Sequence, residues 1–306
     1  MIAVLCGGVG AARYLRGLIR VVEPGDVAAI VNTGDDLTLH GLRICPDLDT
    51  VTYTLADGID PERGWGLAGE TWAAMEALDR YGGASWFRLG DRDLATHLFR
   101  TGRLHEGAGL AEITAEVAAG WGVGVRLLPM TEDPVATRFT LAGGEEITFQ
   151  DYFVRRRHEV PVTAVRFAGV ELARPGPGVL DALETAERVV VAPSNPIVSI
   201  GPVVAVPGVR ERLEARRDGV LAVSPIIAGA ALKGPADRLL EELGEEASVV
   251  GVARRYAPFV GTLVIDEADA DRAAAVEAEG VRCVVAPTIM SGPAESARLA
   301  EVTLSC

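Results

Sequence analysis

The sequence predicts an α/β fold in which a mainly parallel sheet is covered by helices. Short apolar segments such as Ile2–Leu5 and Val27–Val31 alternate along the chain with amphipathic stretches of helical period. These two segments are apolar without interruption, as is typical of parallel strands that are buried on both faces. A chain of 306 residues is also long enough to bury a large core.

The individual elements follow from the same patterns. Strands are predicted at Ile2–Leu5, Val27–Val31, Arg188–Ala192, Gly219–Val223, Ser248–Val252, Gly261–Ile265 and Arg282–Ala286. Helices are predicted at Ala11–Val22, Thr71–Tyr81, Asp93–Arg103, Leu110–Gly120, Pro235–Leu243 and Asp269–Glu279. Between Val125 and Thr148, short β-like runs flank a Gly-Gly turn, which is typical of antiparallel hairpins. We therefore expect a core in two parts, 1–124 and 181–306, separated by a small inserted β-containing subdomain at 125–180.

The composition restricts the class of partner and the compartment. The chain has 43 acidic and 29 basic residues and a net charge of −14, which disfavours nucleic acid as the main partner. No apolar run is long enough to span a membrane, and no signal peptide opens the chain. The four cysteines show no C-x-x-C spacing, so we expect free thiols in the cytoplasm.

A glycine-rich turn follows the first predicted strand. Cys6-Gly7-Gly8-Val9-Gly10 leads from this strand into a helix. Glycines allow a tight turn and bring backbone N–H groups close to an anion, and the helix dipole favours negative charge there. The turn therefore predicts a phosphate site. Because it lacks the spacing of the dinucleotide fingerprint and the Gly-Lys-Ser/Thr of a P-loop, a strand-to-helix turn without a ligand is the alternative.

Carboxylates follow the second predicted strand. Asp35 and Asp36 come directly after it, at the sheet edge where ligands bind in open α/β folds. Asp47 and Asp49 are two residues apart, so in extended backbone they would share a face. Clustered carboxylates beside a phosphate turn predict a hydrated Mg²⁺ that bridges protein and diphosphate. Alternatively, Asp35 and Asp36 cap a helix or turn and Asp47 closes an Asx-turn.

Two later turns and one arginine-rich segment are further candidates. Pro193-Ser194-Asn195-Pro196 with Ser199, and Ser224-Pro225 with Lys233-Gly234, could contact phosphate or ribose, or could be ordinary βα turns. In Trp86–His97, the arginines at 88 and 92 could clamp phosphate oxygens, and the two aromatic residues could stack on a planar ring. Asp91 or Asp93 could cap the following helix. His97 is expected either on the exposed surface of that helix or in the core of the protein. The basic run 155–158 is expected on a solvated face of the inserted subdomain.

Taken together, these motifs resemble the 2-phospho-L-lactate transferase family of coenzyme F420 biosynthesis. The likeness covers nearly the whole chain, and its most specific parts are Pro46–Thr50 and Gly90–His97. The resemblance implies a Rossmann-like three-layer core, a homodimer, Mg²⁺ dependence and a particular reaction. The ribityl hydroxyl of the deazaflavin Fo attacks the phosphate that bears the lactyl or enolpyruvyl group of a guanosine diphosphodiester, and GMP leaves.

The resemblance also implies roles for individual residues. Gly7, Gly8 and Gly10 would hold the diphosphate, and Asp35, Asp36 and Asp49 the metal. Asp49 would also orient the attacking hydroxyl, Arg88 or Arg92 would line the Fo pocket and take part in catalysis, and Asp91 would be a further binding residue. Ser194, Asn195 and Ser199 would hold the guanine nucleotide. No activated serine or cysteine is apparent, so direct transfer without a protein-bound intermediate is expected.

Two other function classes fit the sequence less well. Nucleotide-sugar-binding regulators that resemble the gluconeogenesis-factor branch continue Asp-Asp with Gly-Gly-Ser-Ser, whereas Asp36 is followed here by Leu37-Thr38. An NAD-dependent oxidoreductase would need a G-x-G-x-x-G turn with an acidic residue at the expected place after it. Among the possible donors, Cys45 before Pro46 favours the enolpyruvyl compound by analogy.

Overall fold

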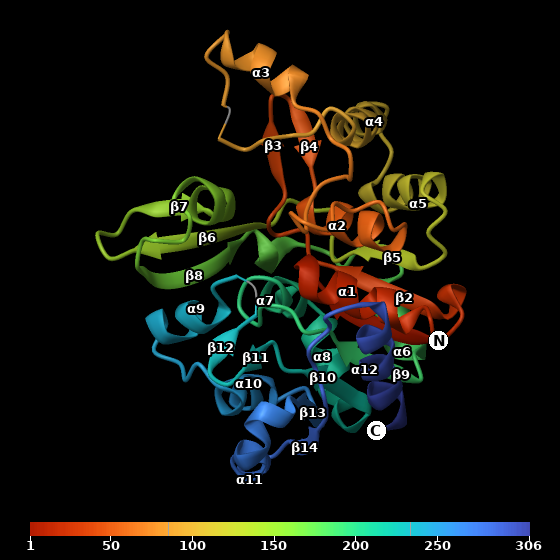
Figure 1. The fold of residues 1–306 in the computed structure, drawn as a ribbon, viewed down its shortest axis with the longest axis vertical. Coiled ribbons are helices and arrows are strands. Elements are labelled where there is room, and N and C mark those ends of the chain that lie inside the picture. Colours follow the sequence, from red (N-terminus) through yellow and green to blue (C-terminus); the bar gives the residue numbers. More distant parts are fainter. Residues whose placement is uncertain (85, 233) are drawn as a thin grey trace.

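A parallel sheet forms the centre of the molecule. The structure, a computed structural model, describes residues 1–84, 86–232 and 234–306. Its seven-stranded sheet has the order β14-β13-β10-β9-β1-β2-β5, and every neighbouring pair is parallel. The strands are β1 (Ile2–Cys6), β2 (Val27–Val31), β5 (Arg126–Pro129), β9 (Arg188–Val191), β10 (Val220–Val223), β13 (Thr262–Ile265) and β14 (Arg282–Val285). Helices cover both faces of this sheet, which confirms the predicted α/β fold (Figure 1).

The two faces of the sheet carry separate cores. In β1, Ala3 and Leu5 belong to one core and Ile2 and Val4 to the other, because successive side chains of a strand point to opposite faces. The second of these cores includes helices α1 (Gly8–Leu18), α2 (Pro46–Leu55), α5 (Leu110–Gly120) and α12 (Pro293–Ser305). The first includes α6 (Val179–Thr185), α7 (Ile200–Ala205), α8 (Val209–Ala215), α9 (Ala236–Glu242), α10 (Val249–Tyr256) and α11 (Ala273–Ala278).

Two smaller units extend from this core. The cap lobe, at the top of Figure 1, consists of the hairpin β3 (Leu37–Leu39) and β4 (Leu42–Ile44) with helices α3 (Ala73–Asp79) and α4 (Asp93–His105). It has its own small core around Ile44, Met75 and Leu89. The inserted sheet has the antiparallel order β7-β6-β8, with β6 (Ala136–Leu141), β7 (Glu146–Thr148) and β8 (Val162–Ala168).

Short elements complete the fold. They are the strands β11 (Ile226–Ile227) and β12 (Ala230–Ala231) and the short 3₁₀ or π-helical segments η1 (Pro24–Asp26), η2 (Asp151–Arg155), η3 (Val170–Leu172), η4 (Arg217–Gly219) and η5 (Glu267–Arg272). None of the helices in the described part of the chain has the length and apolar character needed to cross a membrane.

Three predicted elements differ from the structure. Ser248–Val252 is not a strand, because the Ser248 hydroxyl caps α10 by accepting hydrogen bonds from the N–H groups of Val250 and Gly251. The hairpin interpretation of Val125–Met130 is also wrong, since β5 pairs in parallel with β2 in the main sheet. Finally, the backbone from Pro46 to Leu55 is helical rather than extended, with proline in the first turn.

Candidate active site

The glycine turn joins β1 to α1 and lies against an acidic side chain of α2. The N–H of Gly8 donates a hydrogen bond of 2.9 Å to Oδ1 of Asp47. Gly8 has a φ of +72°, a left-handed conformation that favours glycine. A Cβ atom on Gly7 would lie 2.6 Å from Oδ2 of Asp47, and one on Gly10 would lie 2.2 Å from the carbonyl oxygen of Pro193. Gly7 thus admits the carboxylate, whereas Gly10 allows α1 to pack against the loop after β9.

Two carboxyl groups meet at this turn, and Asn32 at the end of β2 joins them. Its amide nitrogen donates to Oδ2 of Asp35 at 3.0 Å and to Oδ2 of Asp47 at 2.9 Å. All three side chains are buried. Burial raises the pKa of Asp47 to about 6, and burial together with the charge of Asp47 raises the pKa of Asp35 well above its usual range. The structure therefore brings Asp35 together with Asp47 rather than with Asp49.

Asp36 has a different partner. Its Oδ2 atom lies 2.9 Å from Nη2 of Arg43, on β4 of the cap lobe. Burial raises the pKa of Asp36 to about 7, although the Arg43 charge opposes this shift. Asp36 is thus an ion-pair residue that connects the acidic turn to the cap lobe.

Asp49 faces the cap lobe as well. Its Oδ2 accepts a 3.2 Å hydrogen bond from Nη1 of Arg100, and its Oδ1 is paired with Nη2 of the same guanidinium group. The prediction that Asp47 and Asp49 share a face is wrong, because residues two apart on an α-helix point about 200° apart. Asp47 therefore contacts the glycine turn, and Asp49 contacts α4.

A polar network surrounds this ion pair. Nδ1 of His97 lies 3.7 Å from Oδ2 of Asp49, and its Nε2 lies 3.3 Å from Oδ2 of Asp93. The hydroxyl of Tyr53, on α2, donates to Oδ1 of Asp93 at 2.6 Å. His97 is buried, as the core interpretation of this residue predicts. The network fastens α2 to α4.

Two clusters of side chains offer ligand atoms for a cation. Ligand atoms of Asp49, Asp93 and His97 lie within 4.8 Å of one another, but Arg100 already binds both oxygens of Asp49, so a cation there would lie beside a guanidinium group. Asp35 and Asp47 make no ion pair with a basic side chain among the described residues, and Oδ1 of Asp35 is buried without a hydrogen-bond partner. A Mg²⁺ ion that keeps several waters needs only one or two carboxylates, so Asp35 and Asp47 fit it better.

The predicted residues of the Trp86–His97 segment stabilise the cap lobe. The Asp91 carboxylate accepts hydrogen bonds of 2.9 Å from the N–H groups of Ala73 and Ala74, so it caps α3, which precedes it in the chain. Glu70 in turn caps α4 by accepting hydrogen bonds of 2.8 Å from the N–H groups of Arg92 and Asp93. The two acids therefore hold the amino-terminal ends of α3 and α4 close together.

The two arginines of this segment are also held within the lobe. The Arg88 guanidinium lies 4.7 Å from the ring centre of Trp72, and Arg92 donates to the carbonyl of Ala68 at 2.5 Å. Neither side chain forms a hydrogen bond with the glycine turn or the carboxylates in the part of the chain that the structure describes. Trp86 and Phe87 pack edge to face with ring centres 5.9 Å apart.

The loop after β9 lies beside the glycine turn. The Ser194 hydroxyl donates to the carbonyl of Gly7 at 2.9 Å, and the Cβ atom of Ser199 would lie 3.0 Å from a Cβ on Gly7. Oδ1 of Asn195 accepts from the N–H groups of Ile197 and Val198, so this side chain shapes the loop. In the other predicted loop, Ser224 bonds within its own turn, and Lys233 lies outside the described residues.

Several residues of the site received no role from the sequence. They are Asn32, Arg43, Tyr53 and Arg100. For α4 there was a signal, because Asp93, His97 and Arg100 recur at positions i, i+4 and i+7 and therefore share one helix face. Polar residues at this spacing indicate a face that packs against polar partners.

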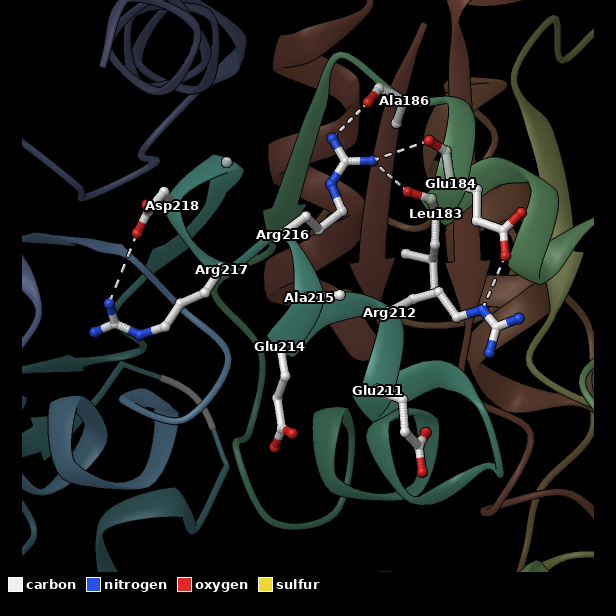
Figure 2. Close-up of a pocket in the computed structure, with 11 residues that line it drawn as sticks. Leu183, Glu184, Ala186, Glu211, Arg212, Glu214, Ala215, Arg216, Arg217 and Asp218 are labelled. Carbon is white, nitrogen blue, oxygen red and sulfur yellow. Dashed lines mark hydrogen bonds and ion pairs between the residues drawn. The ribbon is translucent and has the colours of Figure 1, made fainter.

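A cavity of about 820 Å³ lies elsewhere, beside the ends of α6 and α8. Figure 2 shows that its arginines are already bound, since Arg216 donates to the carbonyls of Leu183 and Ala186 and Arg212 pairs with Glu184. These residues lead into the amino-terminal ends of β9 and β10, whereas ligands bind at the carboxyl ends in this type of fold. The acidic pair at the glycine turn is therefore the better candidate site.

Comparisons with known proteins give matches over nearly the whole chain. A family model described as 2-phospho-L-lactate transferase CofD matches residues 2–288. Phosphoenolpyruvate transferases from Kitasatospora aureofaciens and Streptomyces coelicolor are each 44% identical to this chain, and each alignment covers 99% of this chain and 97% of the relative. The corresponding enzyme of Thermobifida fusca is 45% identical, over 98% of this chain and 95% of its own. A solved UPF0052-family structure from Bacillus halodurans has a TM-score of 0.64 at 15% identity, covers 99% of this chain and 98% of its own, and shows the fold alone.

Proposed function

Because the chain belongs to the 2-phospho-L-lactate transferase (CofD) family of coenzyme F420 biosynthesis, we propose that its donor is the enolpyruvyl guanosine diphosphodiester. In this reaction a ribityl oxygen of Fo forms a bond to the phosphorus that bears the enolpyruvyl group, the bond from that phosphorus to the GMP oxygen breaks, and the ribityl proton is released. The support for this donor is the name phosphoenolpyruvate transferase on relatives that are 44–45% identical over nearly the whole chain.

The main support for the location of the active site is the pair of buried carboxyl groups beside the glycine turn. We propose that Asp35 and Asp47 would hold Mg²⁺, because no basic side chain neutralises them and one oxygen of Asp35 lacks a partner among the described residues. The ion would supply positive charge against the developing charge on the diphosphate oxygens. Asp36 and Asp49 are omitted from this ligand set because Arg43 and Arg100 already neutralise them.

The chain's own groups would orient the two substrates. The first N–H of α1, that of Gly8, donates to Asp47, whereas no side chain of the described residues accepts from the following N–H groups of the first turn, which remain available to an anion. Asn32 holds both carboxyl groups in place, and Ser194 holds the carbonyl of Gly7. We place Fo between this turn and the cap lobe, where Arg88 and Arg92 lie, and the guanine nucleotide near Ser199. Positioning and charge neutralisation of this kind provide most of the catalysis in phosphoryl transfer.

A competition assay tests the donor. The purified protein is incubated with Fo, Mg²⁺ and equal amounts of the lactyl, enolpyruvyl and glyceryl guanosine diphosphodiesters, and the products are identified by mass spectrometry. We expect the dehydro product and an equal amount of GMP, and no product after chelation of the metal. A dominant lactyl product would overturn the donor assignment, and product formation at full rate in excess chelator would overturn the role of Mg²⁺.

The same proposal includes a homodimer, which rests on the resemblance, and a cytoplasmic location, which rests on the cysteine pattern. Light scattering of the purified protein checks the dimer. A thermal-shift titration tests the alternative class, because a ligand that binds the folded state raises the unfolding temperature. We expect stabilisation by GDP with Mg²⁺, whereas stabilisation by a UDP-sugar alone would favour a nucleotide-sugar-binding regulator.

A further inference from the structure

The inserted sheet contacts the acidic turn directly. The backbone N–H of Thr137, on β6, donates to the carbonyl of Gly34 at 2.7 Å. The side-chain amide of Gln150, which follows β7, donates to the carbonyl of Asp35 at 2.9 Å. Thr137 is 1% exposed and Gln150 is 6% exposed, so both contacts are buried. A unit more than a hundred residues away in sequence therefore holds the turn that carries the proposed cation ligand.

Two buried oxygen atoms in this contact lack partners. Neither Oγ1 of Thr137 nor Oδ1 of Asp35 forms a hydrogen bond within the described part of the chain. The two groups are neighbours, since the Thr137 hydroxyl lies close enough to oppose the rise in the pKa of Asp35 that burial causes, although the two groups do not meet in hydrogen-bond geometry. A Cβ atom on Gly34 would lie 3.1 Å from both Oγ1 of Thr137 and Oδ1 of Asn32. The Thr137 hydroxyl thus lies beside Gly34, between Asn32 and Asp35 in the acidic turn.

Buried polar atoms are almost always bonded, so a pair without partners calls for a missing third group. Hydroxyl, carboxylate and water oxygens are the ligands that Mg²⁺ takes. We infer that Thr137 is a further ligand, directly or through one water, of the cation that Asp35 and Asp47 hold. The site is then assembled from the core and the inserted sheet, with Gln150 as a positioning residue that fixes the backbone of Asp35. This inference rests on the proposed metal site.

The test removes the hydroxyl without changing the shape of the side chain. Thr137→Val is compared with Thr137→Ser, which keeps the hydroxyl, and with Thr140→Val, a matched change on the opposite face of β6. Mn²⁺ binding to each metal-free protein is measured by calorimetry and by electron paramagnetic resonance, without substrates. We expect at least tenfold weaker binding by Thr137→Val, as ligand-supporting groups typically contribute, and binding within twofold of wild type for the two controls.

Thermal unfolding separates this role from a structural one. Without metal, Thr137→Val is expected to be at least as stable as wild type, because it removes a buried hydroxyl that has no partner among the described residues. With saturating Mn²⁺, wild type is expected to gain more stability than the variant. Mn²⁺ affinity of Thr137→Val within twofold of wild type would overturn the inference and indicate only a buried water at this place. Since these measurements need no substrate, they fail independently of the donor assignment.

Discussion

Removal of the Arg100 guanidinium should destabilise the protein strongly. The side chains of Arg100 and Asp49 are only 3% and 7% exposed, and the guanidinium binds both oxygens of the carboxylate. Arg100→Met keeps most of the volume but leaves a buried carboxylate whose bound guanidinium is gone. Loss of one partner from a buried ion pair costs about 3–5 kcal/mol, which is a large part of the stability of a typical domain. We expect a decrease of this size in the free energy of unfolding, measured by urea denaturation.

A double-mutant cycle shows whether the loss belongs to the pair. Asp49→Asn should also destabilise, because it leaves Arg100 buried without its counter-charge. The double variant carries neither charge, so its loss of unfolding free energy should be smaller than the sum of the two single losses by roughly 1–3 kcal/mol. Arg103→Met, on α4, is the matched control and should change the stability less, because the glutamate partners of Arg103 are far more exposed than Asp49. Additive losses, or a loss below about 1 kcal/mol for Arg100→Met, would refute the claim that this pair fastens α2 to α4.

Three other predictions concern the turn, the pH dependence and the cap lobe. Gly10→Ala should lower the unfolding temperature, since its Cβ would lie 2.2 Å from a backbone oxygen, whereas Gly102→Ala has free space and should stabilise α4 by up to about 1 kcal/mol. Burial raises the pKa of Asp47 from 3.8 to about 6, so the folded state binds its proton more tightly than the unfolded state does. In urea titrations, metal-free wild type should therefore lose stability relative to Asp47→Asn as the pH rises from 4 to 7. A stability difference between wild type and variant that stays flat or rises over this range would contradict this. Arg88→Ala should raise KM for Fo in steady-state assays more than Arg63→Ala does, and the opposite order would argue against Arg88 in the acceptor pocket.

The sheet was predictable because its strands have a local signature. β1 and β2 are apolar throughout, and both faces of each strand are buried. The same reasoning failed for α10, where Val249 and its apolar neighbours form a buried helix, because an apolar run has no period that separates helix from strand. The position of β5 depends on pairing with β2, almost a hundred residues earlier, which no local pattern encodes.

The candidate site was predictable in its segments but not in its pairings. The glycine turn, Asp35 and the loop that carries Ser194 do lie together. Which carboxylate lies at the turn was decided by the helical phase of α2, and Pro46 was the signal for that helix. Arg100 lies 51 residues from its partner, so only the tertiary structure shows that Asp49 is already neutralised.

Helix α2 connects the glycine turn at the edge of the sheet to the cap lobe. One side of this ten-residue helix touches the glycine turn through Asp47, and the other side is locked to α4 through Asp49. If the cap lobe tilts away from the sheet, either the ion pair between Asp49 and Arg100 breaks, or α2 moves with the lobe and carries the Asp47 carboxylate away from the glycine turn. Inserting a single residue between the two aspartates would rotate one of them by about 100° about the helix axis, so either the contact of Asp47 with the glycine turn or that of Asp49 with Arg100 would be lost. The spacing of these two acids thus sets the register between the lobe and the sheet edge.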